Sequence, residues 1–174
     1  MIADLGTGTG ALGLSLLQEM PLGSAEVWMT DESEDALHVA RANAAGIGRA
    51  AAGARFAHGS WFDALLADDR GGFDVIVSNP PYIAIGDPEV DASVLNYEPS
   101  SALFAGADGL DDIRIIVSGA PHWLMPGGLL ALEIGYTQGD AVNELLVGHG
   151  FTSVSVHQDL SGRHRFVTGL MPSL

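Results

Sequence analysis

The stretch Asp4-Leu5-Gly6-Thr7-Gly8-Thr9-Gly10-Ala11-Leu12-Gly13 decides the fold, because it joins a short apolar run to a helical pattern of leucines. This order predicts a strand at residues 2–5, a glycine-rich turn and a helix. Glycine tolerates positive φ and lets a ligand approach the backbone, and the first turn of a helix presents unpaired N–H groups. The turn therefore offers a docking place for a nucleotide or a carboxylate, although a plain tight turn fits the same residues.

The next strand is predicted at residues 25–31 and ends in Asp31, about 20 residues beyond the glycine turn. An acid at this position of a strand–turn–helix–strand unit can accept hydrogen bonds from both hydroxyl groups of a ribose. We therefore assign Asp31, rather than Glu32, to a ribose. The alternative is that Asp31 caps the helix that follows, for which Ser33 is also available.

Two large aromatic residues, Trp61 and Phe62, follow the third predicted strand at residues 54–57. They come where the first two strands also end, and an adenine ring needs such a flat apolar slot. We expect Trp61 to stack on an adenine or to line its pocket. The alternative is that the aromatic pair belongs to the core and opens a short helix at residues 62–66.

The fourth predicted strand is the apolar run Phe73–Ser78, and Asn79-Pro80-Pro81-Tyr82 follows it directly. Each proline has a fixed φ and holds the residue before it extended, so local helix bonding cannot use the carbonyls of Asn79 and Pro80. The result is a stiff cluster of hydrogen-bond acceptors beside an aromatic ring, which suits a planar –NH2 group. The alternative is that Pro-Pro merely ends the strand and Tyr82 packs.

The remaining chain continues the alternation of helices and strands. We predict helices at residues 34–45, ending before Gly46, at 110–124 and at 138–147, and strands at 129–134, after Pro126-Gly127-Gly128, at 152–157 and at 165–171. This pattern predicts an α/β fold with a doubly wound, mostly parallel seven-stranded sheet and an antiparallel hairpin at one edge. The stretch from Tyr82 to about residue 101 lacks periodicity, which is typical of a lid or a binding loop.

Composition limits the functions that fit. The 174 residues suit one domain, and 7 Lys+Arg against 22 Asp+Glu give a net charge of −15, which opposes direct binding of nucleic acid. The absence of cysteine and of a long apolar run favours a cytoplasmic protein without a membrane anchor. The chain starts abruptly at its first strand, so we expect that an N-terminal segment is missing or belongs to a separate chain.

Taken together, these motifs resemble a class I S-adenosylmethionine-dependent methyltransferase with a Rossmann-like fold. Within that class the chain looks like the HemK/PrmC family, the peptide chain release factor glutamine N5-methyltransferases. The resemblance rests on Asp4-Leu5-Gly6-Thr7-Gly8-Thr9-Gly10, Asn79-Pro80-Pro81-Tyr82-Ile83, Tyr97-Glu98-Pro99 with Ala102-Leu103, Gly109-Leu110-Asp111, Pro126-Gly127-Gly128, Leu132-Glu133-Ile134-Gly135 with Gln138, and Asp159-Leu160-Ser161-Gly162-Arg163.

The resemblance implies methyl transfer from S-adenosyl-L-methionine, with S-adenosyl-L-homocysteine as product, to the side-chain amide nitrogen of a release-factor glutamine. It implies no metal. It assigns catalysis to Asn79, Pro80 and Tyr82, and substrate binding to these three with Pro81. It places the methyl donor on Gly6, Thr7, Gly8, Thr9, Gly10, Asp31, Trp61 and Asn79.

The chain also departs from the family. Residues 1–174 correspond to the catalytic domain alone, and the N-terminal helical domain that helps the family to dock the release factor is absent from this sequence. Ser60 stands where many relatives have an acid before the aromatic pair, and His164 stands where an aspartate is usual. These differences leave open whether the chain binds its substrate unaided and how it holds the adenine amino group.

Other functions share part of the pattern. A DNA amino-methyltransferase would have the same Asn79-Pro80-Pro81-Tyr82, but the net charge opposes it. A glutamine methyltransferase of a ribosomal protein would share nearly all of these residues, and so would a truncated S-adenosylmethionine-binding module without activity. An NAD dehydrogenase accounts for the glycine turn and Asp31, but not for the Asn-Pro-Pro-Tyr cluster.

Overall fold

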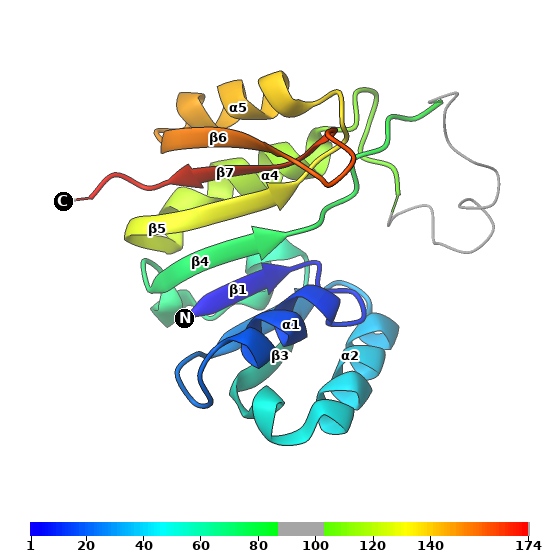
Figure 1. Cartoon of the computed structure of the whole chain (residues 1–174), viewed down its shortest axis with the longest axis vertical. Helices are drawn as coiled ribbons and strands as arrows, with labels where there is room; N and C mark the ends of the chain where they lie inside the picture. Colours follow the sequence, from blue (N-terminus) through cyan, green and yellow to red (C-terminus); the bar gives the residue numbers. More distant parts are fainter. Residues whose placement is uncertain (87–102, 174) are drawn as a thin grey trace.

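The computed structural model describes residues 1–86 and 103–173, and these form one seven-stranded sheet (Figure 1). The strand order is β3-β2-β1-β4-β5-β7-β6, in which β7 runs antiparallel between β5 and β6. The sheet therefore confirms the predicted doubly wound topology and the antiparallel edge hairpin. The strands are β1 (Ile2–Leu5), β2 (Val27–Asp31), β3 (Ala54–His58), β4 (Phe73–Ser78), β5 (Leu124–Glu133), β6 (Thr152–Gln158) and β7 (His164–Leu170).

Helices cover both faces of the sheet and bury one apolar cluster on each. A smaller cluster, with Ile2 and Met29 from the sheet, packs beneath α1 (Ala11–Glu19) and α2 (Glu34–Ile47). A larger cluster packs beneath α4 (Asp111–Gly119) and α5 (Gly139–Gly148). Successive residues of β1 point to opposite faces, so every residue of this strand is buried.

The parallel strands end in line at one edge of the sheet. Leu5 of β1 pairs with Thr30 of β2 and with Ser78 of β4, and Ser78 pairs in turn with Leu132 of β5. The Ser78 Oγ donates a hydrogen bond of 2.7 Å to the Leu5 carbonyl, which fixes the two central strand ends against each other. Figure 1 shows that the glycine turn and the chain leaving β4 lie together at this edge.

Two predicted helix boundaries are wrong. The helix after β2 does not end before Gly46 but continues to Ile47, and Gly48, with φ 72°, is its C-cap. Glycine is tolerated inside a helix, and here the second glycine rather than the first takes the left-handed conformation that stops it. The helix expected at residues 62–66 is instead a short 3-10 turn, Trp61–Ala64.

The predicted helix at residues 110–124 is also too long. It ends at Gly119, continues as the 3-10 turn Ala120–His122 that contains Pro121, and gives way to β5 at Leu124. Pro126-Gly127-Gly128 therefore lies within β5 rather than before it. Register shifts between Phe73 and Val75 of the neighbouring strand accommodate these residues, because proline and glycine fit a strand at an irregularity of its ladder.

Most of the predicted loop after Tyr82 lies outside the described residues, together with Tyr97-Glu98-Pro99 and Ala102. The flanking residues are placed, and Ile83 forms a parallel bridge with Phe104. Ile83 N donates to the Leu103 carbonyl, and Ala105 N donates to the Ile83 carbonyl, both at 3.0 Å. Among the described residues, no helix has the length and apolar character needed to cross a membrane.

Two adjacent isoleucines of α4 test which face of this helix stabilises the fold. Ile116 is fully buried in the larger cluster, whereas Ile115 is 48% exposed. We expect Ile116→Ala to lower the free energy of unfolding by about 2–5 kcal/mol, through lost burial and the cavity that remains. The matched Ile115→Ala variant should change it by about 0.5 kcal/mol. Urea denaturation measures both, and equal losses would contradict the assigned orientation of α4.

Candidate active site

The buried carboxylate of Asp4 holds the glycine turn from inside. Its Oδ2 accepts a hydrogen bond of 2.6 Å from Thr7 Oγ1 and one of 2.9 Å from Gly13 N. A Cβ at Gly13 would lie 2.8 Å from the same oxygen, so only glycine leaves room for this approach. Asp4 thereby joins the beginning of the turn to the first turn of α1.

The turn itself uses left-handed backbone at alternate residues. Gly8 has φ 56° and Gly10, the N-cap of α1, has φ 83°. A Cβ at Gly8 would meet no atom within 4 Å, so backbone conformation rather than crowding favours glycine there. The open space beside Gly8 leaves the turn accessible to a ligand at the sheet edge.

Asp31 holds the same turn from the outside. Its Oδ2 accepts a hydrogen bond of 2.8 Å from Gly8 N, and its Oδ1 accepts one of 2.9 Å from Ser33 N. The helix cap is Ser33, whose Oγ accepts from Ala36 N at 3.2 Å. The alternative in which the Asp31 side chain caps α2 is therefore wrong, and Asp31 lies beside the glycine turn as its predicted role requires.

The two aromatic residues after β3 have different surroundings. Phe62 stacks on Trp123 with ring centroids 5.9 Å apart, so Phe62 belongs to the core as the alternative expected. Trp61 is half-buried, and a Cβ on Gly6 would lie 3.2 Å from its ring. Its φ of 46° is unusual for a bulky residue. Such backbone strain persists only where the surrounding structure holds it, and it often marks a functional site.

The residues after β4 divide into an exposed amide and a held aromatic ring. Asn79 is exposed, and its side chain makes no hydrogen bond with the residues that the structure describes, whereas Pro80 is buried. Tyr82 is half-buried and donates a hydrogen bond of 3.3 Å from its hydroxyl to Glu133 Oε1. Burial, followed by the neighbouring Glu133 carboxylate, raises the pKa of Tyr82, so the phenol stays neutral.

Three positions that support this site did not emerge from the residue-by-residue interpretation. Gln138 donates from Nε2 to the Tyr82 carbonyl at 3.0 Å. Arg165 of β7 lies 3.4 Å from the Tyr82 hydroxyl and forms an ion pair with Glu133. Asp112 of α4 is half-buried; burial raises the pKa of its carboxyl, whereas its interaction with Trp61 lowers it. Gln138 was noticed only through the family resemblance.

The two family departures have structural surroundings of their own. Ser60 is the N-cap of the 3-10 turn that begins at Trp61, but its side chain makes no capping hydrogen bond. The His164 ring lies against Gly139, where a Cβ would come within 2.8 Å of its Nδ1. The histidine therefore packs against the first residue of α5.

Carboxylates concentrate on the glycine-turn side of the edge. Burial, assisted by the charge of Asp31, raises the pKa of Asp4 to about 6, although the hydrogen bonds from Thr7 and Gly13 lower it. Burial likewise raises the pKa of Asp112, assisted by Asp111 and Glu32. Such mutual repulsion is relieved by a nearby positive charge, so this side of the edge suits a cationic ligand.

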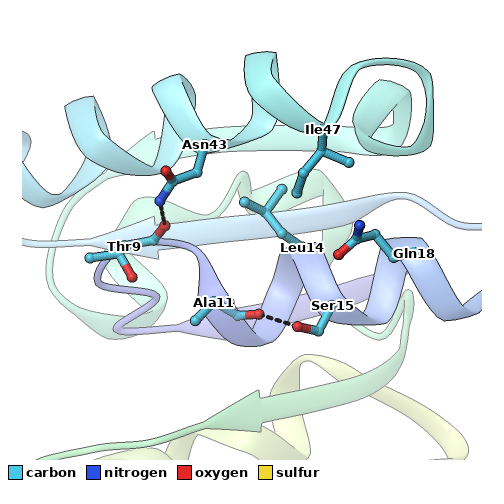
Figure 2. Close-up of a pocket in the computed structure, with 7 residues that line it drawn as sticks. All are labelled: Thr9, Ala11, Leu14, Ser15, Gln18, Asn43 and Ile47. Atoms are coloured by element: carbon cyan, nitrogen blue, oxygen red, sulfur yellow. Dashed lines mark hydrogen bonds between the residues drawn. The ribbon is translucent and has the colours of Figure 1, made fainter.

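A separate hollow of about 330 Å³ lies between α1 and α2 (Figure 2). Leu14, Gln18 and Ile47 line it, and Asn43 donates from Nδ2 to the Thr9 carbonyl at 2.9 Å across its mouth. Of the predicted site residues, only Thr9 lines this hollow. The hydrogen bond from Asn43 to Thr9 supports the glycine turn from α2.

Comparison with known proteins assigns the chain to a family. The methyltransferase small domain model matches residues 1–96. The release factor glutamine methyltransferase of Xylella fastidiosa strain Temecula1 is 47% identical over 173 residues, covering 98% of this chain and 60% of the relative. That of Neisseria gonorrhoeae is 45% identical over 166 residues, covering 95% and 59%. The chain thus spans about 60% of the length of these relatives.

Among solved structures, a methyltransferase from Pyrococcus furiosus superposes with a TM-score of 0.71 at 19% identity. The match covers 99% of this chain and 75% of that one. At this identity the likeness concerns the fold alone. It confirms the predicted Rossmann-like methyltransferase architecture.

The raised pKa of Asp4 predicts a pH dependence of stability. The Asp4 carboxyl binds its proton more tightly in the folded chain than in the unfolded chain, where its pKa is about 4. The free energy of unfolding therefore falls as pH rises from about 4 to 6. We expect the difference in unfolding free energy between wild type and Asp4→Asn to decrease by about 3 kcal/mol or less across this window. Urea denaturation at several pH values measures it.

Thr7→Val provides a second arm of this test. The Thr7 hydrogen bond lowers the pKa of Asp4. Loss of this hydrogen bond should therefore raise the pKa of Asp4 in the folded chain and extend the pH range over which stability falls to higher pH. A difference between wild type and Asp4→Asn that is independent of pH would contradict the raised pKa.

Proposed function

The chain belongs to the methyltransferase small domain family, and from this we propose that it methylates the side-chain amide nitrogen (N5) of a glutamine in a peptide chain release factor. Its curated relatives with this name match it over nearly its whole length. The observation that carries the proposal is the placement of the Asn79–Tyr82 loop beside the glycine turn. The 2.7 Å hydrogen bond from Ser78 Oγ to the Leu5 carbonyl fixes this placement.

The residues at the glycine turn fit S-adenosylmethionine as the methyl donor. When bound, it supplies an electrophilic methyl group on a positively charged sulfur. The open backbone at Gly8, the Asp31 carboxylate and the Trp61 ring beside Gly6 match a backbone-contacting chain, a ribose and an adenine. We assign the donor to Gly6, Thr7, Gly8, Thr9, Gly10, Asp31, Trp61 and Asn79.

Charge supports the same assignment. The sulfonium is a cation. Asp4, Asp31 and Asp112 lie around the turn, and few basic side chains contact them among the residues that the structure describes. A cationic ligand reduces the repulsion between these carboxylates. Donor binding should therefore stabilise the fold as well as load the site.

Asn79 and Pro80 act on the acceptor. An amide nitrogen is a weak nucleophile because its lone pair is delocalised into the carbonyl. The Asn79 side-chain oxygen and the Pro80 carbonyl accept hydrogen bonds from the two N–H groups of the glutamine amide. These hydrogen bonds turn the amide nitrogen toward the donor. The same acceptors stabilise the positive charge that the nitrogen gains as its bond to the methyl group forms and the methyl–sulfur bond breaks. The nitrogen then loses one N–H proton to solvent, which leaves a neutral N-methyl amide. Asn79 suits this role because it is exposed and makes no hydrogen bond with described residues.

Tyr82 contributes its ring rather than its hydroxyl. The hydroxyl is occupied by Glu133 and Arg165, so it does not serve as a general base. The ring face packs on the plane of the glutamine amide, and Pro81 holds the backbone extended before it. A cation–π contribution of about 0.5–2 kcal/mol near the sulfonium is consistent with this placement.

We further propose that residues 1–174 form the catalytic domain and act in the cytoplasm on a protein rather than on nucleic acid. The net charge of −15 supports a protein acceptor, because binding to a phosphate backbone depends on basic residues.

Direct assay tests the proposed reaction. Incubation of the chain with labelled S-adenosylmethionine and a purified release factor should place one methyl group on a glutamine side chain, located by mass spectrometry. Ribosomal proteins assayed in parallel serve as competing acceptors. Label only on a ribosomal protein, or donor binding without transfer to either acceptor, would contradict the release-factor assignment.

Two variants separate the donor and acceptor sides. Asn79→Ala should lower kcat by about 100-fold or more, because it removes an acceptor aimed at the reacting amide. Donor affinity should stay near the wild-type value, because Asn79 is one of eight residues assigned to the donor and the other seven are unchanged. Asp31→Ala should weaken donor binding by about 10- to 100-fold, because hydrogen bonds to the charged group are lost. Isothermal titration calorimetry and methylation kinetics measure these effects. Full activity of Asn79→Ala would overturn the acceptor role.

A further inference from the structure

We propose that Gln138 is a positioning residue for methyl transfer, which holds the Asn79–Tyr82 loop in its working geometry without touching the substrate. This inference rests on the proposed function of that loop. Gln138 lies between β5 and α5, far from the loop along the chain, and its side chain is half-buried. The geometry of its amide group carries the proposal.

One side-chain amide contacts four backbone groups from three segments, and its two N–H hydrogens are shared among three carbonyls. Gln138 Nε2 donates to the carbonyls of Tyr82 at 3.0 Å, Gly109 at 3.2 Å and Asp108 at 3.3 Å. Gln138 Oε1 accepts from Gly135 N at 2.8 Å. The amide therefore joins the loop after β4, the turn before α4 and the turn after β5 at a single point.

The surrounding backbone is close enough to exclude any side chain larger than glycine. A Cβ on Gly109 would overlap the Tyr82 carbonyl and would lie 2.8 Å from Gln138 Nε2. A Cβ on Gly135 would lie 3.0 Å from Gln138 Oε1. Glycine at both positions therefore permits the close approach that the amide of Gln138 uses.

Gln138 complements the contacts at the other end of Tyr82. The hydroxyl of this residue is held by Glu133 and Arg165, and its carbonyl is held by Gln138. The carbonyl contact is the one nearer to Pro81 and Asn79 along the backbone. Loss of Gln138 would leave the ring tethered and Ile83 N bonded to the Leu103 carbonyl, but it would leave the Tyr82 carbonyl without its partner.

The amide is not needed to build the helix on which it lies. Gln138 is the N-cap of α5, but its side chain makes no capping hydrogen bond. Val142 and Leu146 bury the helix in the larger cluster. Substitution of Gln138 should therefore alter the loop far more than the fold.

Two variants of similar size test this role in the full chain. Gln138→Met retains the length of the side chain but none of its hydrogen bonds. Gln138→Glu retains the acceptor for Gly135 N but turns an oxygen toward three carbonyl groups. We expect both variants to lower kcat toward the release factor by about 10- to 100-fold, because small misplacement of reacting groups has effects of this size. Donor affinity should stay within about twofold, since the donor residues other than Asn79 lie in the glycine turn and after β2 and β3 rather than in this loop.

Gln18→Met and Gln18→Glu serve as matched controls. Gln18 is exposed on α1, and these substitutions should leave kcat and donor affinity unchanged. Hydrogen exchange provides a readout that does not depend on activity. In both Gln138 variants, amides at residues 82–86 should exchange faster than in wild type, while residues 4–13 should keep their protection.

The outcomes separate the inference from the proposed function. Unchanged exchange at residues 82–86, or faster exchange with wild-type kcat, would overturn the positioning role. A loss of donor affinity equal to the loss of kcat would show a general structural effect and would overturn it as well. A wild-type chain that leaves the release factor unmethylated would contradict the proposed function, while the exchange rates would still decide whether Gln138 orders the loop.

Discussion

The two hydrogen bonds accepted by Oδ2 of Asp4 determine where the glycine turn lies. Burial of a carboxylate is unfavourable unless hydrogen bonds compensate it, and here both come from the turn and helix that the acid must organise. Asp31 adds a second carboxylate on the opposite side of the same turn, through Gly8 N. The two acids thus build the turn at the cost of mutual repulsion. Because these two carboxylates lie close together, the site suits a cation before any ligand binds.

The other half of the edge is organised by neutral groups. Gln138 holds the Tyr82 carbonyl of the loop after β4, and the charged pair of Glu133 and Arg165 contacts the neutral hydroxyl of Tyr82. Reaction at an amide nitrogen requires oriented acceptors and does not require a base in advance. The division of the edge into a carboxylate-rich side and an amide-rich side matches the chemistry proposed for each. The topology brings them together because β1 and β4 are neighbours.

Much of this arrangement could be predicted from the sequence, because its main parts are local motifs at strand ends. The glycine turn, Asp31 and the Asn79 loop each follow a recognisable strand, and parallel strands place such residues at one edge. Gln138 and Arg165 could not be placed in the same way. Their contacts with Tyr82 span 56 and 83 positions of the chain and depend on the order of β5 and β7 in the sheet. The end of α2 was predicted wrongly for another reason. Gly46 and Gly48 can both end a helix, and only packing decides between them.

The bridge between Ile83 and Phe104 has an evolutionary consequence. It ties together the two points between which the chain leaves the sheet edge and returns, so the spacing of these points does not depend on the segment that joins them. The entropy of closing a loop grows only slowly with its length, by about 0.6 kcal/mol for each doubling. Insertions, deletions or exchange of that segment can therefore accumulate without moving the Asn79 amide.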